Sequence, residues 1–304
     1  MQIAHGDLNR SIDALERLVE QFAENDALLL DPSQLRRRVE ALDLLDAHFP
    51  DASQPISDAA SNTAELYRRA RAIYARLEAV NCELYEGIRG EIRRGGRPDI
   101  FLRWVASSAE MEGVAGPANG LGYDYLDELI SGVFRFEEPD AGPVRREAEM
   151  VLYQPTPARH IFHLIGLTAL TATDVLVDIG CGLGHVPLLA SILTSARSIG
   201  IELEATYVER ARQSAESLNL KRVTFIQHDA RAADLSAGTV FYLYTPFTGS
   251  ILSSVLNRLR REAAARPIRI CTYGPCTSVI AEESWLEAAA APAPHRIALF
   301  RSRS

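Results

Sequence analysis

The segment 175–184, Val-Leu-Val-Asp-Ile-Gly-Cys-Gly-Leu-Gly, predicts a strand that runs directly into a glycine-rich turn. Its apolar run, Leu176–Ile179, is typical of a buried parallel strand and is interrupted only by Asp178. Three glycines follow at alternate positions: Gly180, Gly182 and Gly184. Such glycines let the backbone turn sharply and let a ligand approach without a Cβ in the way. Because Val186–Leu193 is apolar and helix-compatible, the segment predicts a strand, a ligand-binding turn and a helix.

The spacing of these glycines indicates which ligand the turn accepts. A dinucleotide-binding turn follows the pattern G-x-G-x-x-G, and its third glycine packs the helix onto the strand. Here the third glycine comes one residue earlier, and Asp178 stands two residues ahead of the first. An anion at that place repels a pyrophosphate and suits a cationic or amino-bearing ligand.

Three further strand-like segments follow in order. Ser198–Glu202 closes on a carboxylate, and Val223–Gln227 leads into His-Asp-Ala at 228–230. Thr239–Tyr244 ends in Tyr-Thr-Pro-Phe at 244–247. Together with the glycine turn, this series resembles the class I S-adenosylmethionine-dependent methyltransferases over roughly residues 150–304.

The resemblance implies S-adenosylmethionine as the cofactor and gives individual residues a role. In the family, the acid at the end of the second strand, here Glu202, accepts hydrogen bonds from both ribose hydroxyls. An acid at the position of Asp229 lies near the adenine amino group, and the loop that starts at Tyr244 lies on the substrate side. The predicted cofactor-binding residues are Thr156, Asp178, Gly180, Gly182, Gly184, Glu202, Asp229, Ala230 and Tyr244.

A proline-bearing segment, Tyr153–Pro157, precedes the first strand and resembles the segment that walls the cofactor site in some of these enzymes. It leads into a predicted helix over Ala158–Leu170, and Pro157 suits a helix start. Thr156 has two possible roles: it caps this helix, or it bonds the methionine carboxylate of the cofactor.

Each of these residues also has a purely structural interpretation. The glycines can serve packing alone, and Glu202 can be a solvated charge near the start of the next helix. Asp229 can cap a turn. His185, after the glycine turn, is more typical of a packing or surface residue than of a catalyst, and Cys181 fills a small space more readily than it reacts.

No catalytic residue can be found by pattern, because methyl transfer from a sulfonium requires alignment of donor and acceptor and, for a protonated acceptor, removal of a proton. Enzymes that methylate exocyclic amines of nucleic-acid bases carry Asn or Asp, two prolines and an aromatic where this chain has Tyr244–Phe247. The departure disfavours adenine or cytosine as acceptor. The loop has a faint likeness to protein-lysine methyltransferases outside the SET group.

The acceptor therefore stays open between a protein lysine and a small amine or hydroxyl compound. Two other functions compete with methyl transfer. One is a non-catalytic scaffold that kept the fold, and the other is a nicotinamide-dependent oxidoreductase, which the glycine spacing opposes.

Composition excludes several other classes. The 304 residues are 47% apolar and 24% charged, as in ordinary globular proteins, and no run approaches a membrane helix. The first residues lack the pattern of a signal peptide. Four scattered cysteines form neither a disulfide framework nor, with other soft ligands, a zinc site, so no metal is predicted and a reducing cytoplasm is the expected setting.

Charge divides the chain into unlike halves. Residues 1–150 hold 17 Lys and Arg against 28 Asp and Glu, whereas residues 151–304 hold 15 against 12. An acidic half disfavours nucleic acid as a partner, and the basic run at 258–261 is typical of a solvated helix face. We expect the acidic half to shape the acceptor site. The sequence does not indicate an oligomeric state.

The first half is predicted to be helical, with helices over Ser11–Leu30, Ser33–Phe49 and Thr63–Arg94. A turn-rich break is expected at Pro50–Pro55, a loop at Gly113–Gly122, a further helix from Tyr123, and a linker at Glu137–Pro143. The predicted domains are a helical one over 1–140 and a methyltransferase domain over 150–304.

The predicted fold class is α/β: a doubly wound, mostly parallel sheet preceded by an all-α helical domain. The predicted strands are 174–179, 197–202, 222–227, 239–244, 267–273 and 295–302.

Overall fold

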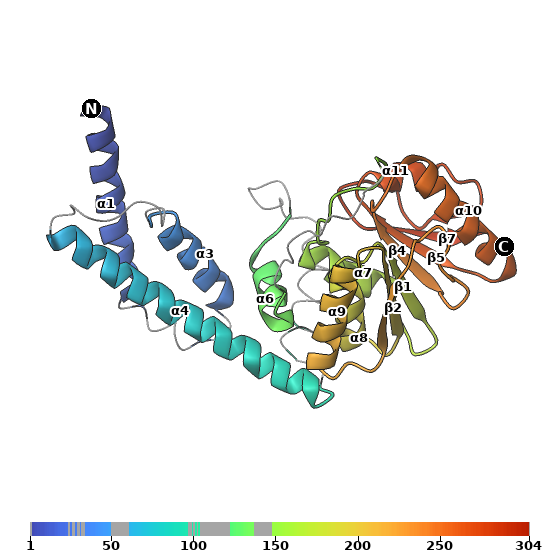
Figure 1. The fold of residues 1–304 in the computed structure, drawn as a ribbon, viewed down its shortest axis with the longest axis horizontal. Helices are drawn as coiled ribbons and strands as arrows, with labels where there is room; N and C mark the ends of the chain where they lie inside the picture. Colours follow the sequence, from blue (N-terminus) through green and yellow to red (C-terminus); the bar gives the residue numbers. More distant parts are fainter. Residues whose placement is uncertain are drawn as a thin grey trace. The chain divides into compact units, whose positions relative to one another are not determined.

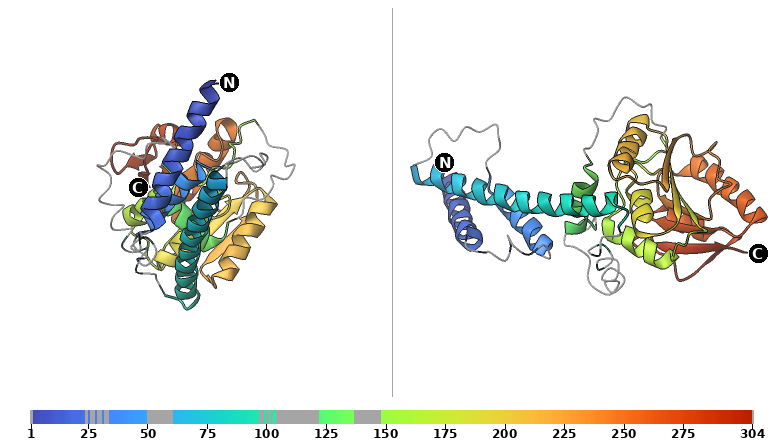
Figure 2. Two further views of the ribbon diagram at one scale, coloured as in Figure 1. Left: turned by 90° about the vertical axis from the view of Figure 1, so that its left-hand side faces the viewer. Right: turned by 90° about the horizontal axis from the view of Figure 1, so that it is seen from below.

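A computed structural model describes residues 2–23, 25, 28, 31, 34–49, 61–96, 99, 101, 103, 122–136 and 148–303 (Figures 1 and 2). The chain divides into two compact units, residues 1–88 and residues 89–304. The predicted break at Pro50–Pro55, the linker at Glu137–Pro143 and the loop at Gly113–Gly122, apart from its last residue, lie outside the described residues. The domain boundary placed between residues 140 and 150 therefore stays a prediction.

The first unit is helical, as predicted. It contains α1 (Gln2–Ala23), α3 (Leu35–Asp46) and most of α4 (Ser61–Arg93). The apolar residues of the longest helix recur every three or four positions from Leu66 to Ile88, and Leu66, Ala70, Leu77 and Ile88 among them are buried. These side chains form a core with α1 and α3, apart from Ile88. Helix α1 starts at Gln2, earlier than the predicted Ser11, and Ala4 and Leu8 continue the apolar period of Ile12 in this first part of the helix.

The second unit is built on one 7-stranded sheet in the order β3-β2-β1-β4-β5-β7-β6. The strands are β1 (Val175–Ile179), β2 (Arg197–Glu202), β3 (Val223–Gln227), β4 (Val240–Tyr244), β5 (Arg269–Tyr273), β6 (Leu286–Ala288) and β7 (Ala298–Ser302). The helices are α6 (Tyr125–Phe134), α7 (Ala158–Thr168), α8 (His185–Leu193), α9 (Ala205–Ser217), α10 (Gly249–Ala265) and α11 (Cys276–Ala281). The first five strands are parallel, and β7 is antiparallel to both of its neighbours.

Helices cover both faces of the sheet, as the predicted doubly wound fold requires. Helices α7, α8 and α9 lie on one face, and α10 and α11 lie on the other (Figure 1). The pleat of β1 explains the division, because alternate side chains point to opposite faces. Val175, Val177 and Ile179 join the core under α10, so Leu176 and Asp178 point to the other face.

Two details near the C-terminus differ from the prediction. The strand expected from His295 begins at Ala298. The short β6, Leu286–Ala288, was not predicted, because three residues are too few to display the alternation that marks a strand.

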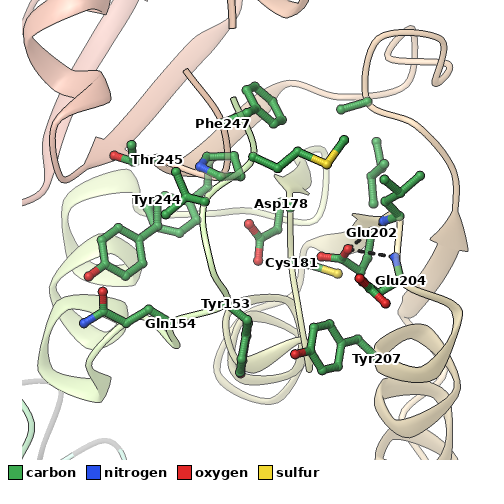
Figure 3. Close-up of a pocket in the computed structure, with 18 of the residues that line it drawn as sticks. Tyr153, Gln154, Asp178, Cys181, Glu202, Glu204, Tyr207, Tyr244, Thr245 and Phe247 are labelled. Carbon is green, nitrogen blue, oxygen red and sulfur yellow. Dashed lines mark hydrogen bonds between the residues drawn. The ribbon is translucent and has the colours of Figure 1, made fainter. Parts of the chain in front are cut away.

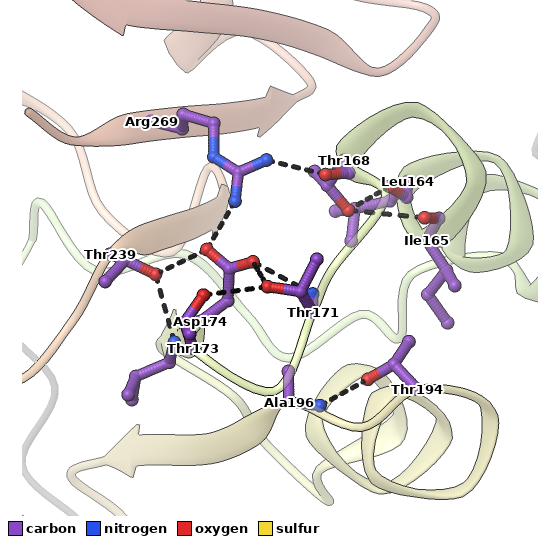
Figure 4. A network of polar contacts seen from close by, with 11 residues as sticks. Leu164, Ile165, Thr168, Thr171, Thr173, Asp174, Thr194, Ala196, Thr239 and Arg269 are labelled. Carbon is purple, nitrogen blue, oxygen red and sulfur yellow. Dashed lines mark hydrogen bonds and ion pairs between the residues drawn. The ribbon is translucent and has the colours of Figure 1, made fainter.

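A polar network fixes the edge of the sheet where β1, β4 and β5 begin (Figure 4). The Asp174 carboxylate accepts hydrogen bonds from the Thr171 backbone at 2.9 Å, from the Thr239 hydroxyl at 3.0 Å and from Arg269 at 2.6 Å. Arg269 also donates to the Thr168 carbonyl at the end of α7 at 2.6 Å. Because these strands are parallel, their carboxyl ends meet at the opposite edge, which is left for a ligand site.

No helix among the described residues is long and apolar enough to cross a membrane.

Candidate functional site

A cavity of about 420 Å³ opens at the carboxyl ends of β1, β2 and β4. Figure 3 shows Asp178 near its middle, with Tyr244 on one side and Glu202 and Glu204 on the other. The predicted cofactor-binding residues that line it are Thr156, Asp178, Gly180, Glu202, Asp229, Ala230 and Tyr244. Gly182 and Gly184 are not among its lining residues.

The glycine turn adopts the left-handed backbone that its glycines predict, with φ of 81° at Gly180, 51° at Gly182 and 83° at Gly184. The backbone N–H groups of Gly180 and Cys181 donate to the carbonyl of Ile201, at 2.8 Å and 3.1 Å, and so tie the turn to β2.

Each glycine leaves room for a different neighbour. A Cβ on Gly180 would lie 2.4 Å from the Cβ of Pro246 in the loop after β4. A Cβ on Gly182 would lie 2.1 Å from the ring of Tyr153, and one on Gly184 would lie 2.5 Å from the ring of Phe225. Gly182 and Gly184 therefore make room for protein side chains, in accord with the packing interpretation, and Gly180 alone combines this role with a place in the cavity wall.

Asp178 is a buried carboxyl group that faces the cavity. Its residue is 4% exposed, and no described group donates a hydrogen bond to its carboxylate. Burial raises its pKa well above the usual range, and the nearby Glu202 carboxylate raises it further. A buried charge without a partner is costly, so this position favours a ligand that brings a positive charge or N–H donors.

Glu202 joins β2 to the glycine turn. One carboxylate oxygen accepts the backbone N–H of Gly182 at 2.9 Å, and the other accepts those of Leu203 at 2.6 Å and Glu204 at 2.9 Å. The side chain is therefore held in place at the cavity wall, which excludes the interpretation of Glu202 as a freely solvated charge.

Asp229 is engaged with its neighbour Arg231. Its carboxylate accepts the backbone N–H of Arg231 at 2.8 Å and is paired with the guanidinium at 2.6 Å. The hydrogen bond from Arg231 lowers the pKa of Asp229. The turn-capping interaction considered from the sequence is thus present, and the residue lines the cavity as well.

Thr156 and Tyr244 lie in the wall formed by the proline segment and β4. The Thr156 hydroxyl lies 2.9 Å from the hydroxyl of Tyr242, and no side chain caps α7 from the N-cap position, Pro157. Asp127 instead accepts the backbone N–H of Ala158 at 2.8 Å, so helix capping is not the role of Thr156. The ring of Tyr244 lies 4.7 Å from that of Tyr273, and burial raises the pKa of Tyr244, which keeps its phenol protonated.

The loop after β4 holds an unusual backbone. Thr245 has a φ of 39°, in the left-handed region that β-branched residues rarely adopt. Its hydroxyl donates to the carbonyl of Tyr273 and accepts the N–H of Cys276, both at 3.1 Å, and these bonds stabilise the conformation. Such backbone strain is often found at functional sites.

Several lining residues were not predicted as ligand contacts. Met150, Tyr153, His185, Tyr207 and Phe247 all line the cavity. The proline segment indicates the region of Tyr153 and the loop after Tyr244 indicates that of Phe247, but no local pattern marks Met150, His185 or Tyr207 as a ligand contact. His185 packs on Phe136, with the ring centroids 4.3 Å apart, and burial lowers its pKa to about 3, so the imidazole is neutral. Cys181 is a buried free thiol whose pKa is raised by burial, in accord with its predicted packing role.

The Asp and Glu side chains of the cavity wall face no Lys or Arg within the described lining, although Asp229 is paired with Arg231 outside it. Four carboxylate residues contribute to the described lining: Asp178, Glu202, Glu204 and Asp229. The described lining includes no lysine and no arginine. The described residues also contain no cluster of His, Cys, Asp and Glu suited to a metal ion. The wall therefore suits a cationic ligand and lacks cationic side chains to bind phosphates.

Residues 170–261 match the model of a methyltransferase domain. An uncharacterized protein of Methanocaldococcus jannaschii is 36% identical over 61 residues, which are 20% of this chain and 27% of that protein. The chain thus spans about a quarter of the length of that relative.

Solved structures with a similar fold include an RNA methyltransferase from Salinibacter ruber in complex with S-adenosyl-L-homocysteine (24% identity; 49% of this chain and 92% of that chain; TM-score 0.38). Another is a putative S-adenosyl-L-methionine-dependent methyltransferase from Methanococcus maripaludis (11%; 47% and 83%; TM-score 0.40). The second unit has the strand order and flanking helices of a class I methyltransferase fold, and its residues 170–261 match the methyltransferase domain model.

Proposed function

We propose that this chain is an S-adenosylmethionine-dependent methyltransferase that binds its cofactor in the cavity at the carboxyl ends of β1 and β2. The observation that carries the proposal is the cavity wall, which has four carboxylate residues and neither lysine nor arginine in its described lining. S-adenosylmethionine carries a sulfonium and an ammonium group, which such a wall attracts, whereas the pyrophosphate of a nicotinamide dinucleotide is repelled. A volume of about 420 Å³ is within the usual range for a cofactor site.

The residues of this wall fit the cofactor in specific ways. Asp178 offers a buried carboxylate without a hydrogen-bond donor, which suits the positive charge of the methionine portion. The fixed Glu202 is proposed to accept the ribose hydroxyls, and Asp229 and Ala230 to border the adenine. The cofactor supplies a methyl group on a positively charged sulfur, which is already a good leaving group. The chain then has to align the acceptor and exclude water, and a proton leaves the acceptor as its bond to the methyl carbon forms.

The acceptor is proposed to be a protein lysine or a small amine or hydroxyl compound. The absence of lysine and arginine from the described lining disfavours a phosphate-bearing acceptor, and the acidic first half disfavours nucleic acid. The part of the helical half in shaping the acceptor site stays a prediction. So does the cytoplasmic setting, with which four free thiols are compatible.

Isothermal titration with S-adenosylmethionine and with NAD tests the proposal. We expect binding of the first and none of the second. Incubation with radiolabelled S-adenosylmethionine and a cell extract then distinguishes an enzyme from a scaffold, because only an enzyme transfers the label. Binding of NAD in place of S-adenosylmethionine would support the oxidoreductase alternative.

Glu202→Ala is expected to weaken S-adenosylmethionine binding by about 1–3 kcal/mol, the scale of hydrogen bonds to a charged group. Titration calorimetry measures the change. The matched control is Glu204→Ala, which removes a second carboxylate from the same wall. If both variants lose the same affinity, the effect is one of general charge, and the assignment of the ribose to Glu202 is wrong.

A further inference from the structure

The segment 148–156, here called the strap, separates the cavity from solvent. Seven consecutive residues of it, Met150–Thr156, line the cavity. Val151 and Leu152 are nevertheless 47% and 70% exposed, so the strap is a single layer of chain at this point. On this side, the strap alone encloses a ligand that fills the cavity. Such a ligand leaves on this side when the strap opens.

The inner end of the strap is anchored by buried contacts. The Tyr153 ring packs over Gly182 of the glycine turn, and the Thr156 hydroxyl is bonded to Tyr242. The outer end is held by backbone contacts to the loop after β4. Val151 donates to the carbonyl of Pro246 at 3.2 Å, and Met150 forms an antiparallel bridge with Phe247.

Glu149 completes the outer attachment with its side chain. Its carboxylate accepts the backbone N–H of Ile251 at 3.0 Å and the hydroxyl of Ser250 at 2.8 Å, and its carbonyl accepts the N–H of Thr248 at 2.9 Å. Thr248, the N-cap residue of α10, makes no side-chain cap of its own. The first turn of α10 is thus capped by a residue about 100 positions away in the sequence, a position that also favours negative charge.

Gly249 leaves the space that this contact requires. A Cβ at Gly249 would lie 2.4 Å from the nearer carboxylate oxygen of Glu149. Any side chain there would push the carboxylate away from α10. The contact can therefore be broken from either partner, at Glu149 or at Gly249, without changing a residue that lines the cavity.

We infer that Glu149 is a positioning residue that latches the strap over the cofactor cavity, and that release of this latch lets the cofactor enter and the spent cofactor leave. The identity of the ligand rests on the proposed function. The latch consists of Glu149 and the residues that it contacts at the start of α10. Glu149, Gly249 and Ser250 lie outside the cavity wall. Thr248 and Ile251 line the cavity and contribute backbone N–H groups to the latch. A latch of this kind governs the rates of exchange, whereas a residue that only binds the cofactor or stabilises α10 changes the dissociation constant or the stability.

Glu149→Gln and Gly249→Ala test the inference. We expect both to speed association and release of S-adenosylhomocysteine about tenfold, the factor that corresponds to one charge-assisted hydrogen bond, with the dissociation constant nearly unchanged. Stopped-flow competition measures the rates. The matched controls are Glu287→Gln, on the exposed face of β6, and Gly95→Ala, whose backbone is left-handed like that of Gly249 but where an added Cβ meets nothing within 4 Å. Both should bind and release S-adenosylhomocysteine at the rates of the parent.

Hydrogen exchange without ligand provides the second measurement. Backbone amides in peptides of the strap should exchange hydrogen faster in Glu149→Gln and Gly249→Ala than in the parent. Those in peptides of β1 should exchange at the rate of the parent. Unchanged strap exchange, or slower binding in place of faster binding, overturns the latch. A parent protein that does not bind S-adenosylhomocysteine overturns the proposed function, and the exchange of the strap still decides the latch.

Discussion

Asp178→Asn is expected to lower the affinity for S-adenosylmethionine about tenfold to a hundredfold. The buried carboxylate accepts no hydrogen bond from any described residue, so a cationic ligand gives it its first partner. Loss of a hydrogen bond to a charged group costs about 1.5–3 kcal/mol, which corresponds to this loss of affinity. Above the ordinary carboxyl pKa, the ligand-free variant should in turn be more stable than the parent, because it neither buries an unpaired charge nor has to take up a proton to avoid one. Titration calorimetry and urea denaturation measure the two effects.

The pH dependence follows from the direction of the pKa shift. Burial raises the pKa of Asp178 in the folded protein, so the folded state holds its proton to higher pH than the unfolded chain does. Stability of the ligand-free parent is therefore lost as the pH rises from the ordinary carboxyl pKa through the raised one. Asp178→Asn lacks this loss of stability, so the difference in the free energy of unfolding between the variant and the parent should grow over that pH interval. The affinity of the parent for a cationic ligand should rise over the same interval, and that of the variant should not.

Asp229→Asn is the matched control for this prediction. It makes the same substitution in the same cavity wall, but its carboxylate is already paired with Arg231 at 2.6 Å. Its effect on affinity should be smaller. Equal losses of affinity in the two variants would mean that the overall negative charge of the wall selects the ligand. A direct contact with Asp178 would then not be the cause.

The sequence could predict the parts of the site that depend on local pattern. Buried parallel strands appear as short apolar runs, and the end of such a run locates the ligand edge of the sheet. For this reason the sequence predicts that Asp178, Glu202 and Asp229 bind the same ligand, and the structure brings all three to one cavity.

The partners of these residues could not be predicted, because they come from distant parts of the chain. The Tyr153 ring fills the space that a side chain at position 182 would need, and the Glu149 carboxylate fills the space that one at position 249 would need. Nothing in the local sequence of either glycine indicates its partner. The packing of Gly184 against Phe225 joins the turn to β3 in the same way.

Gly184→Ala is expected to destabilise the protein by about 2–5 kcal/mol. The left-handed backbone at this residue, with a φ of 83°, costs a residue that has a Cβ about 1–2 kcal/mol. The new methyl group would also lie 2.5 Å from the Phe225 ring and 3.3 Å from the Cβ of Ala211, and such overpacking costs about 1–3 kcal/mol. The control Gly166→Ala lies in the exposed middle of α7 and should be neutral or slightly stabilising. Urea denaturation compares the variants.

Gly184→Ala also tests which glycines of the turn serve packing and which face the ligand. Gly184 does not line the cavity, so the folded fraction of Gly184→Ala should bind S-adenosylmethionine with the affinity of the parent. Gly180 lines the cavity, and a Cβ there would displace Pro246 and with it the loop that follows β4. Gly180→Val should therefore abolish binding even where the protein remains folded. Lost affinity in folded Gly184→Ala, or parent-like affinity in folded Gly180→Val, would contradict this division between a packing glycine and a ligand-facing one.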